Sequence, residues 1–186
     1  MGPNRLDERA KNLIDQSAMR RMLIRMAHQI FENNPDLYDV VLIGIRTRGV
    51  HLAHRLQTEL LRIGGVKVPV GEIDITPYRD DLLRRDDYQS NYSNVDFQVE
   101  NRTVILVDDV LYTGRTARAA MEAVIDMGRP ARIQLAVLID RGHRELPIRP
   151  DYVGKNLPSS REEEVLVRIS DVDGVEGVYL VRRGED

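Results

Sequence analysis

Two adjacent aspartates end an apolar run in the stretch VILVDDVLYTGRT, which spans residues 104–116. After Asp108 and Asp109 comes a short loop, Thr113 to Thr116, that carries a glycine and two threonine hydroxyls. A loop between a strand and a helix N-terminus offers an anion both unpaired N–H groups and the helix dipole. Neither GxxxxGK[ST] nor GxGxxG spacing is present, so nucleoside triphosphates and dinucleotides lose support. The pattern therefore predicts a monophosphate site.

The two carboxylates need a partner other than the phosphate, because like charges repel each other. Asp108 and Asp109 can accept hydrogen bonds from hydroxyl groups, or they can face a bridging divalent cation. A ribose 5-phosphate offers hydroxyls beside its phosphate. The chain has no Cys and four scattered His, so magnesium is the leading metal candidate, held by Asp108 and Asp109 either directly or only through ligand and water. Alternatively, Asp108 caps the following turn and Asp109 is solvated.

The composition is that of an ordinary globular domain. The 186 residues are 42% hydrophobic and 31% charged, with a net charge of −3, which excludes a globally basic nucleic-acid binder but not a local basic face. The chain contains no run of about 18 apolar residues and begins without an apolar segment. We therefore expect no membrane association, no signal peptide and a cytoplasmic location.

Hydrophobic periodicity predicts alternating strands and helices. The expected helices cover residues 18–31, 50–63 and 116–127, with Asp15 or Ser17 as cap of the first, and the expected strands cover 40–43, 66–75, 103–107, 133–139, 165–169 and 178–181. We predict one α/β domain over residues 1–186, with a mostly parallel central sheet flanked by helices and a mobile loop at about 79–98. Ligands bind beyond the carboxyl ends of strands in such sheets, where the polar loops 44–49, 108–116 and 140–144 lie.

The same segments resemble a known family. VILVDDVLYTGRT resembles the phosphoribosylpyrophosphate (PRPP) motif of type I phosphoribosyltransferases. Together with GEIDITPYRDD and LAVLIDRGHRELPIRPDYVGKNLPSS, it makes residues 15–170 closely similar to the PyrR family of bifunctional pyrimidine attenuator and uracil phosphoribosyltransferase proteins. The resemblance implies a type I phosphoribosyltransferase fold with a flexible lid loop. It also implies conversion of uracil and PRPP to UMP and pyrophosphate with Mg²⁺, and a homo-oligomer, dimer or higher.

The resemblance also implies roles for individual residues. Residues 44–49 match a pyrophosphate loop, which in this superfamily often holds a non-proline cis peptide, and Arg79 matches the lid residue that closes over the pyrophosphate. Arg141 and the backbone of Val165 would flank the base. The implied catalytic residues are Arg48, Arg79, Asp108 and Asp109. The implied substrate-binding residues are these four together with Thr47, Val110, Leu111, Tyr112, Thr113, Gly114, Arg115, Thr116, Arg141 and Val165.

Two groups of basic side chains stand apart from these loops, one on the first predicted helix and one after residue 142. In the resembling family, equivalent positions bind a hairpin in the leader RNA of pyrimidine genes when uridine nucleotides are present. The implied RNA-binding residues are Arg21, Arg25, His28, His143, Arg144, Arg149 and Lys155. Ile24 and Asn33 depart from the polar or basic residues of that surface. On sequence alone, such groups are usually solvated faces.

Two rival functions remain open on the sequence. The first is an RNA-binding attenuator that only senses uridine nucleotides, without significant catalysis. The second is a receiver-like signalling domain, in which the acid pair would bind magnesium for phosphorylation of an aspartate. A receiver would carry its acid pair on the first strand, whereas here Asp108 and Asp109 follow two strand–helix units. Retention of a pyrophosphate loop favours catalysis over sensing alone.

Overall fold

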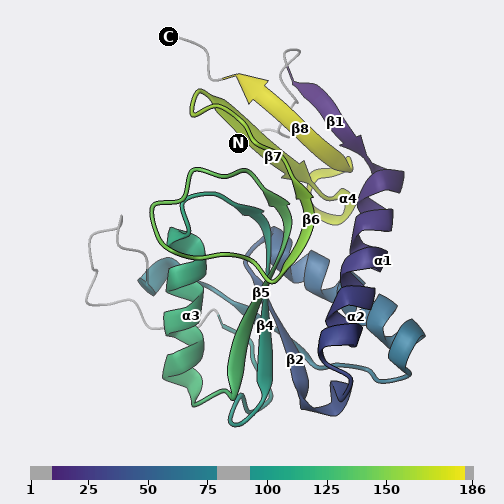
Figure 1. Cartoon of the computed structure of the whole chain (residues 1–186), viewed down its shortest axis with the longest axis vertical. Helices are drawn as coiled ribbons and strands as arrows, with labels where there is room; N and C mark the ends of the chain where they lie inside the picture. Colours follow the sequence, from purple (N-terminus) through teal and green to yellow (C-terminus); the bar gives the residue numbers. More distant parts are fainter. Residues whose placement is uncertain (1–9, 79–92, 183–186) are drawn as a thin grey trace.

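The computed structural model describes residues 10–78 and 93–182, which form two sheets (Figure 1). The larger is a five-stranded parallel sheet in the order β3-β2-β4-β5-β6. Its strands are β2 (Val40–Ile45), β3 (Val70–Ile73), β4 (Thr103–Leu111), β5 (Arg132–Asp140) and β6 (Tyr152–Asn156). The smaller sheet is antiparallel, in the order β1-β8-β7, and consists of β1 (Lys11–Asp15), β7 (Glu163–Arg168) and β8 (Gly177–Arg182). The prediction of a mostly parallel central sheet is confirmed.

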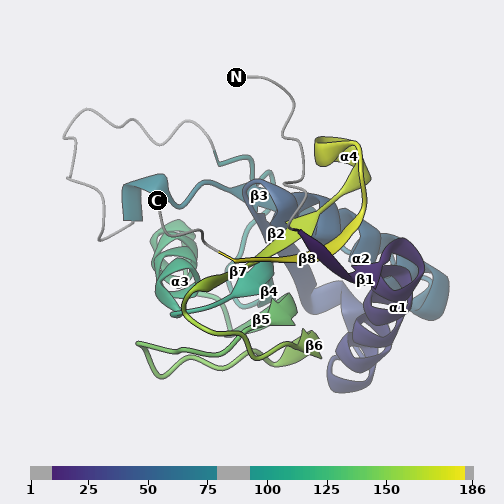
Figure 2. The same ribbon diagram turned by 90° about the horizontal axis from the view of Figure 1, so that it is seen from above.

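Helices cover both faces of the large sheet (Figure 2). The helices are α1 (Gln16–Asn33), α2 (Arg48–Gly64), α3 (Arg115–Met127) and the short α4 (Ser170–Asp173), with 3₁₀ turns η1 (Leu37–Asp39) and η2 (Thr76–Tyr78). Leu42 and Ile105 pack with α1 and α2, whereas Val41 and Leu106 pack with α3. Successive residues of a strand point to opposite faces, so burial on both faces requires the unbroken apolar runs seen in the sequence.

The helix boundaries follow the expected signals. Asp15 caps α1 by accepting a hydrogen bond from the Ala18 N–H at 2.7 Å, which decides between the two predicted caps. Gly65 ends α2 with a left-handed φ of +71°. Among the described helices, none is both long and apolar enough to cross a bilayer.

Several strand predictions were wrong in extent. β4 continues through the acid pair to Leu111 rather than ending at residue 107, because residues 108–111 still pair with β5. The strand expected at 66–75 is reduced to β3. The predicted loop 140–155 contains most of β6, a short edge strand in which Gly154 lies too close to the Leu138 carbonyl for a side chain. β1, which pairs with the distant β8, was not predicted.

The predicted mobile loop, about 79–98, is described only in its last residues, because residues 79–92 lie outside the described ranges. Asn94 pairs with Glu72 of β3 through two backbone hydrogen bonds. Val95 and Phe97 pack where Gly71 leaves room, since a Cβ on Gly71 would come within 2.9 Å of Val95 and 3.1 Å of Phe97. Residues 93–98 are therefore anchored to the sheet.

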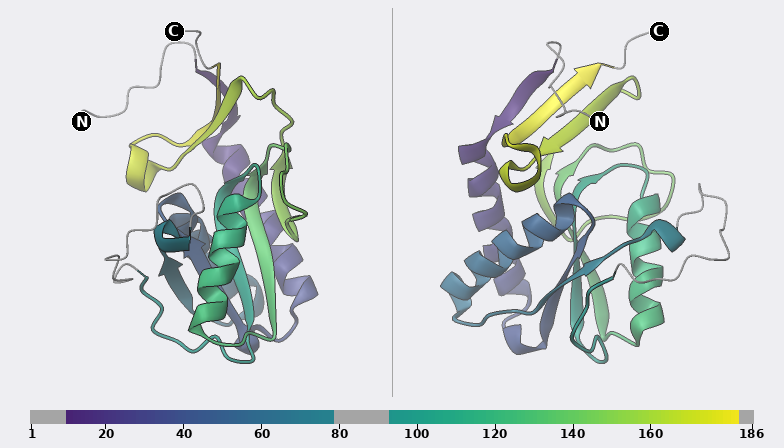
Figure 3. Two further views of the ribbon diagram at one scale, coloured as in Figure 1. Left: turned by 90° about the vertical axis from the view of Figure 1, so that its left-hand side faces the viewer. Right: turned by 180° about the vertical axis from the view of Figure 1, so that it is seen from behind.

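The small sheet lies beyond one end of the large sheet (Figure 3). Strand β7 contacts β4, and the chain entering β7 contacts Arg141, which directly follows the carboxyl end of β5. The small sheet therefore faces the carboxyl edge of the parallel strands, where the polar loops 44–49, 108–116 and 140–144 also lie.

Candidate active site

Asp108 and Asp109 lie near the carboxyl end of β4. Asp108 is buried and Asp109 is half-buried. Each carboxylate accepts a local backbone hydrogen bond, Asp108 from the Asp109 N–H at 2.9 Å and Asp109 from the Val110 N–H at 2.8 Å. Asp108 does not cap a turn, because β4 continues past it to Leu111, and Asp109 is partly shielded from solvent.

The surroundings of the acid pair oppose ionisation. Burial and then the negative charge of Asp109 raise the pKa of Asp108 well above its usual value. Burial also raises the pKa of Asp109, although the nearby Arg48 guanidinium acts in the opposite direction. Two adjacent carboxylates in such a place are suited to bind hydroxyl groups or a cation, because either partner compensates for the lost hydration.

The residues predicted to bind phosphate, Thr113 to Thr116, include the start of α3, and together with Tyr112 they are called here the phosphate loop. Gly114 is the N-cap residue, with a left-handed φ of +95°, and has no side chain with which to cap the helix. The Thr113 hydroxyl accepts a long hydrogen bond, at 3.4 Å, from the N–H of Arg115, the first residue of α3. The positive end of the helix dipole and the N–H groups that follow Arg115 in the first turn can therefore serve an anion. Leu146 and Ile148 lie 3.4–3.5 Å from where a Cβ of Gly114 would be.

The segment after β5 stabilises the phosphate loop by donating hydrogen bonds to the carbonyl oxygens of that loop. The N–H groups of Glu145 and Leu146 both donate to the Thr113 carbonyl, at 2.9 and 3.2 Å. The Arg144 guanidinium donates to the carbonyls of Tyr112 and Ile148, at 2.8 and 2.9 Å, and forms an ion pair with Asp140. Arg144 was predicted to contact RNA, but the structure turns it inward to stabilise the phosphate loop.

The pyrophosphate loop, residues 44–49, joins β2 to α2. The peptide bond Arg46–Thr47 is cis, which confirms the expectation for this loop. A Cβ on Gly49 would lie 2.3 Å from the Val107 carbonyl oxygen and 3.3 Å from the Asp108 Cα. The glycine therefore lets the start of α2 lie directly against β4 beside the acid pair.

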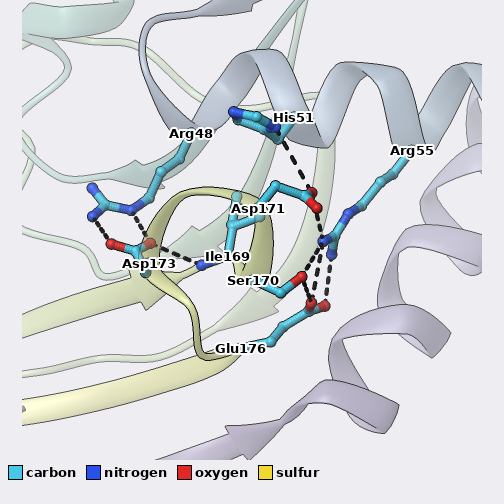
Figure 4. A network of polar contacts seen from close by, with 8 residues as sticks. All are labelled: Arg48, His51, Arg55, Ile169, Ser170, Asp171, Asp173 and Glu176. Carbon is cyan, nitrogen blue, oxygen red and sulfur yellow. Dashed lines mark hydrogen bonds and ion pairs between the residues drawn. The ribbon is translucent and has the colours of Figure 1, made fainter.

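The two arginines of the pyrophosphate loop have carboxylate partners. Arg46 pairs with Glu72 of β3. Arg48 donates from Nε and Nη2 to the two oxygens of Asp173, at 3.0 and 2.7 Å (Figure 4). Asp173 was not recognised from the sequence, where its only signal was a run of acidic residues in SDVDGVEG.

Arg141 connects the phosphate loop to the small sheet. Its guanidinium carbon lies 4.2 Å from the centre of the Tyr112 ring, and its Nη2 donates to the carbonyls of Ser160 and Glu163 at 2.8 and 2.7 Å. Val165 is buried on β7. The side chain of Arg141 is thus held by contacts within the protein, and its own N–H donates to the Leu111 carbonyl at 3.1 Å.

Of the other residues predicted to bind RNA, some contact the rest of the protein and others are exposed to solvent. Arg25 donates to the carbonyls of Val153 and Gly154, which brings α1 beside β6 and Lys155. His143 is half-buried and contacts the Ser159 carbonyl. Arg21, His28, Arg149 and Lys155 are exposed. Arg79 lies outside the described residues.

No group of three or more His, Cys, Asp or Glu residues is arranged to hold a metal ion in the described parts of the chain. Asp108 and Asp109 supply oxygen ligands of the kind that Mg²⁺ prefers, but Mg²⁺ takes six ligands. The acid pair is therefore compatible with a magnesium ion whose remaining ligands come from a phosphate substrate and water.

Comparisons with known proteins agree with this architecture. A family model described as phosphoribosyl transferase domain matches residues 9–169. The chain is 52% identical to the bifunctional protein PyrR of Halalkalibacterium halodurans, covering 92% of this chain and 97% of that one. It is 53% identical to the bifunctional protein PyrR of Listeria welshimeri, covering 93% and 97%. Among solved structures, the hypoxanthine phosphoribosyltransferase of Trypanosoma cruzi superposes with a TM-score of 0.71 at 20% identity, covering 92% and 96%.

The fold and the site define a phosphoribosyltransferase of type I architecture. More narrowly, the chain belongs to the PyrR family of bifunctional phosphoribosyltransferases. This membership excludes the receiver-like alternative.

The buried acid pair predicts a pH-dependent cost in stability. Because burial and Asp109 raise the pKa of Asp108, the folded state binds more protons than the unfolded chain, and stability falls as pH rises through the folded pKa. Asp108→Asn removes this loss. We expect urea denaturation in magnesium-free buffer to give the variant a higher free energy of unfolding than the wild type at about pH 7, with the difference shrinking toward about pH 4.

The exposed residue Asp96 provides the control, since Asp96→Asn should bring no comparable gain. Equal or lower stability of Asp108→Asn at neutral pH would contradict the account of the acid pair.

Proposed function

We propose that the protein transfers the phosphoribosyl group of PRPP to uracil, and that it binds the leader RNA of pyrimidine genes in response to UMP. The observation that carries the enzymatic part is the meeting of three features at one sheet edge. These are the acid pair on β4, the uncapped helix start at Gly114 and the pyrophosphate loop held against β4 by Gly49. The name of the two relatives, bifunctional protein PyrR, supports both parts.

In the proposed reaction, N1 of uracil forms a bond to C1′ of the ribose while the bond from C1′ to the pyrophosphate oxygen breaks. The bonding electrons leave with pyrophosphate, and the N1 proton passes to the departing pyrophosphate or to water. Glycosyl displacements of this kind have oxocarbenium-like character, so the site acts by positioning both reactants and stabilising charge. No protein nucleophile is needed.

Each loop has a role in this reaction. Residues Thr113 to Thr116 bind the 5′-phosphate, and Asp108 and Asp109 accept hydrogen bonds from the ribose 2′- and 3′-hydroxyls. Val110, Leu111 and Tyr112 form the backbone between them. Thr47 and Arg48 bind the pyrophosphate, with Arg79 closing from the lid. Asp108 and Asp109 would hold Mg²⁺, directly or through ligand and water, and the ion would neutralise charge on the pyrophosphate.

The base lies between the backbone after β5, near Arg141, and the backbone of Val165. A uracil edge presents a donor between two acceptors, which backbone N–H and C=O groups can match. Cytosine has donor and acceptor positions exchanged relative to uracil, so it would leave buried polar groups of the protein unpaired.

For RNA binding, the inward orientation of Arg144 narrows the proposed surface. Arg21, Arg25, His28, Arg149 and Lys155 form the basic face, named so hereafter, and the Arg25 contacts with β6 bring its two halves together. Arg144 and His143 lie outside the basic face. Arg144 stabilises the phosphate loop through the Tyr112 carbonyl, and His143 contacts the Ser159 carbonyl. The action on messenger RNA implies a cytoplasmic location.

We further propose a homo-oligomer, a dimer or higher. The exposed apolar side chains of Ile125, 60% exposed, and Met127, 39% exposed, near the C-terminus of α3 support an association surface.

The enzymatic part predicts that purified protein with magnesium converts uracil and PRPP to UMP, with cytosine a poor substrate. Asp109→Asn should lower kcat/KM by about two orders of magnitude, equivalent to roughly 2.7 kcal/mol, because a ribose contact is weakened. A radiolabelled-uracil assay measures both. An unchanged rate would remove the acid pair from catalysis, and absence of product from the wild type would leave the attenuator that only senses uridine nucleotides.

The regulatory part predicts that Arg149→Gln combined with Lys155→Gln weakens leader-RNA binding without lowering kcat/KM. For about five phosphate contacts with a slope near −0.7 each, the wild-type affinity should fall roughly a hundredfold between 50 and 200 mM salt. The double variant should show a shallower dependence in filter-binding titrations. UMP should tighten RNA binding, and RNA should tighten UMP binding by the same factor.

Arg62→Gln combined with Lys67→Gln is the matched control, because it removes two exposed cations that do not belong to the basic face. An equal loss of RNA affinity in the control would mean that RNA responds to the overall charge of the protein and not to the basic face. Wild-type protein that ignores leader RNA at low salt with UMP present would contradict the regulatory proposal.

A further inference from the structure

Asp173 joins the small sheet to the pyrophosphate loop (Figure 4). Its Oδ1 accepts from Arg48 Nη2 at 2.7 Å and from Arg168 Nη1 at 2.9 Å, and its Oδ2 accepts from Arg48 Nε at 3.0 Å and from the Ile169 N–H at 2.9 Å. The carboxylate therefore binds four donors from three parts of the chain: the first residue of α2, the last residue of β7 and the residue before α4.

The Asp173 carboxylate is shielded from water and charged. The side chains of Asp173 and Arg168 are each 7% exposed, whereas that of Arg48 is 30% exposed. Burial disfavours the charged form, but hydrogen bonds from Arg48, the Ile169 N–H and Arg168 outweigh it, so the pKa of Asp173 lies well below its usual value. Two guanidinium groups around one carboxylate leave a net positive charge beside the pyrophosphate loop.

The geometry of the Arg48 contact leaves part of the guanidinium available. A guanidinium has five N–H donors in one plane, and Asp173 binds the edge made by Nε and Nη2. The edge made by Nη1 and the second hydrogen of Nη2 is not occupied by this carboxylate. A bidentate ion pair fixes the plane of the group, so this second edge has a defined direction in advance of ligand binding.

A second set of contacts docks the same segment without reaching Arg48. Arg55, two turns along α2, pairs with Glu176 at 2.6 Å and Asp171 at 3.3 Å, and His51 lies 3.8 Å from Asp171. These contacts attach the connection between β7 and β8 to the side of α2. Of the three acidic side chains, Asp173 is the one that contacts the pyrophosphate loop.

We propose that Asp173 is a positioning residue for phosphoribosyl transfer, which orients the Arg48 guanidinium so that its second edge binds the pyrophosphate group of PRPP. This inference rests on the proposed function, because it takes residues 44–49 as the pyrophosphate site. Asp173 acts through Arg48 and touches neither substrate. It also makes the position of the small sheet depend on the loop that binds pyrophosphate.

The test compares Asp173→Asn with Glu176→Gln, a matched change in the same segment that removes the carboxylate bound to Arg55. Steady-state kinetics give KM for PRPP and for uracil, and calorimetry gives the Kd of PRPP with magnesium. For Asp173→Asn we expect KM and Kd for PRPP to rise about tenfold, because a misplaced guanidinium loses much of its contact, while KM for uracil stays within about twofold. Glu176→Gln should leave all of these values within about twofold of the wild type.

A double-mutant cycle separates positioning from general stabilisation. Because Asp173 acts through Arg48, adding Asp173→Asn to Arg48→Gln should not weaken PRPP binding any further. If Asp173→Asn does not fold, judged by circular dichroism, Asp173→Glu keeps the charge beside Arg168 but displaces the carboxylate by one methylene, and it should also weaken PRPP binding selectively.

Three results would overturn the inference: unchanged PRPP binding in the Asp173 variants, a parallel rise of KM for PRPP and uracil that Glu176→Gln reproduces, or additive losses in the cycle. These are distinguishable from failure of the proposed function. A wild-type protein that makes no UMP from uracil would contradict the latter, while the calorimetric PRPP titration would still report on Asp173.

Discussion

The close packing of α2 against β4 is the constraint on which the site depends. Gly49 lies where a Cβ would be 2.3 Å from the Val107 carbonyl, so only a residue without a side chain lets the start of α2 approach the strand. This contact sets Arg48 near enough to Asp109 to influence its ionisation. Arg48 in turn holds Asp173, and through it the small sheet. One backbone contact thereby relates the acid pair, the pyrophosphate loop and the second sheet.

The site is arranged for a ligand at some cost to the unliganded protein. Burial and the negative charge of Asp109 oppose the ionisation of Asp108, and the N-cap residue of α3 is a glycine without a capping side chain. Both features are unfavourable alone and become favourable when hydroxyls, a cation or a phosphate binds. The protein offsets part of this cost outside the site, where Arg144 and the N–H groups of Glu145 and Leu146 bind the carbonyls of the phosphate loop.

Local patterns predicted most of the elements but not their long-range pairing. The helical spacing of the methionine-rich stripe predicted α1, and the unbroken apolar runs predicted β2 and β4 as buried strands. Asp15 could be predicted as a cap because it acts on its own helix. The short β1 and β6 form because distant strands pair with them, which periodicity cannot reveal. Asp173 was missed, and the contacts of Arg144 within the protein were not foreseen, for the same reason: the direction of a charged side chain depends on partners that come together only in the folded chain.

The position of UMP in a crystal structure of its complex tests the central claim most directly. The account predicts that the 5′-phosphate accepts hydrogen bonds of about 3 Å from the N–H groups of residues 113–116, while the ribose 2′- and 3′-hydroxyls donate to Asp108 and Asp109. UMP bound elsewhere, or with its phosphate away from the start of α3, would contradict it.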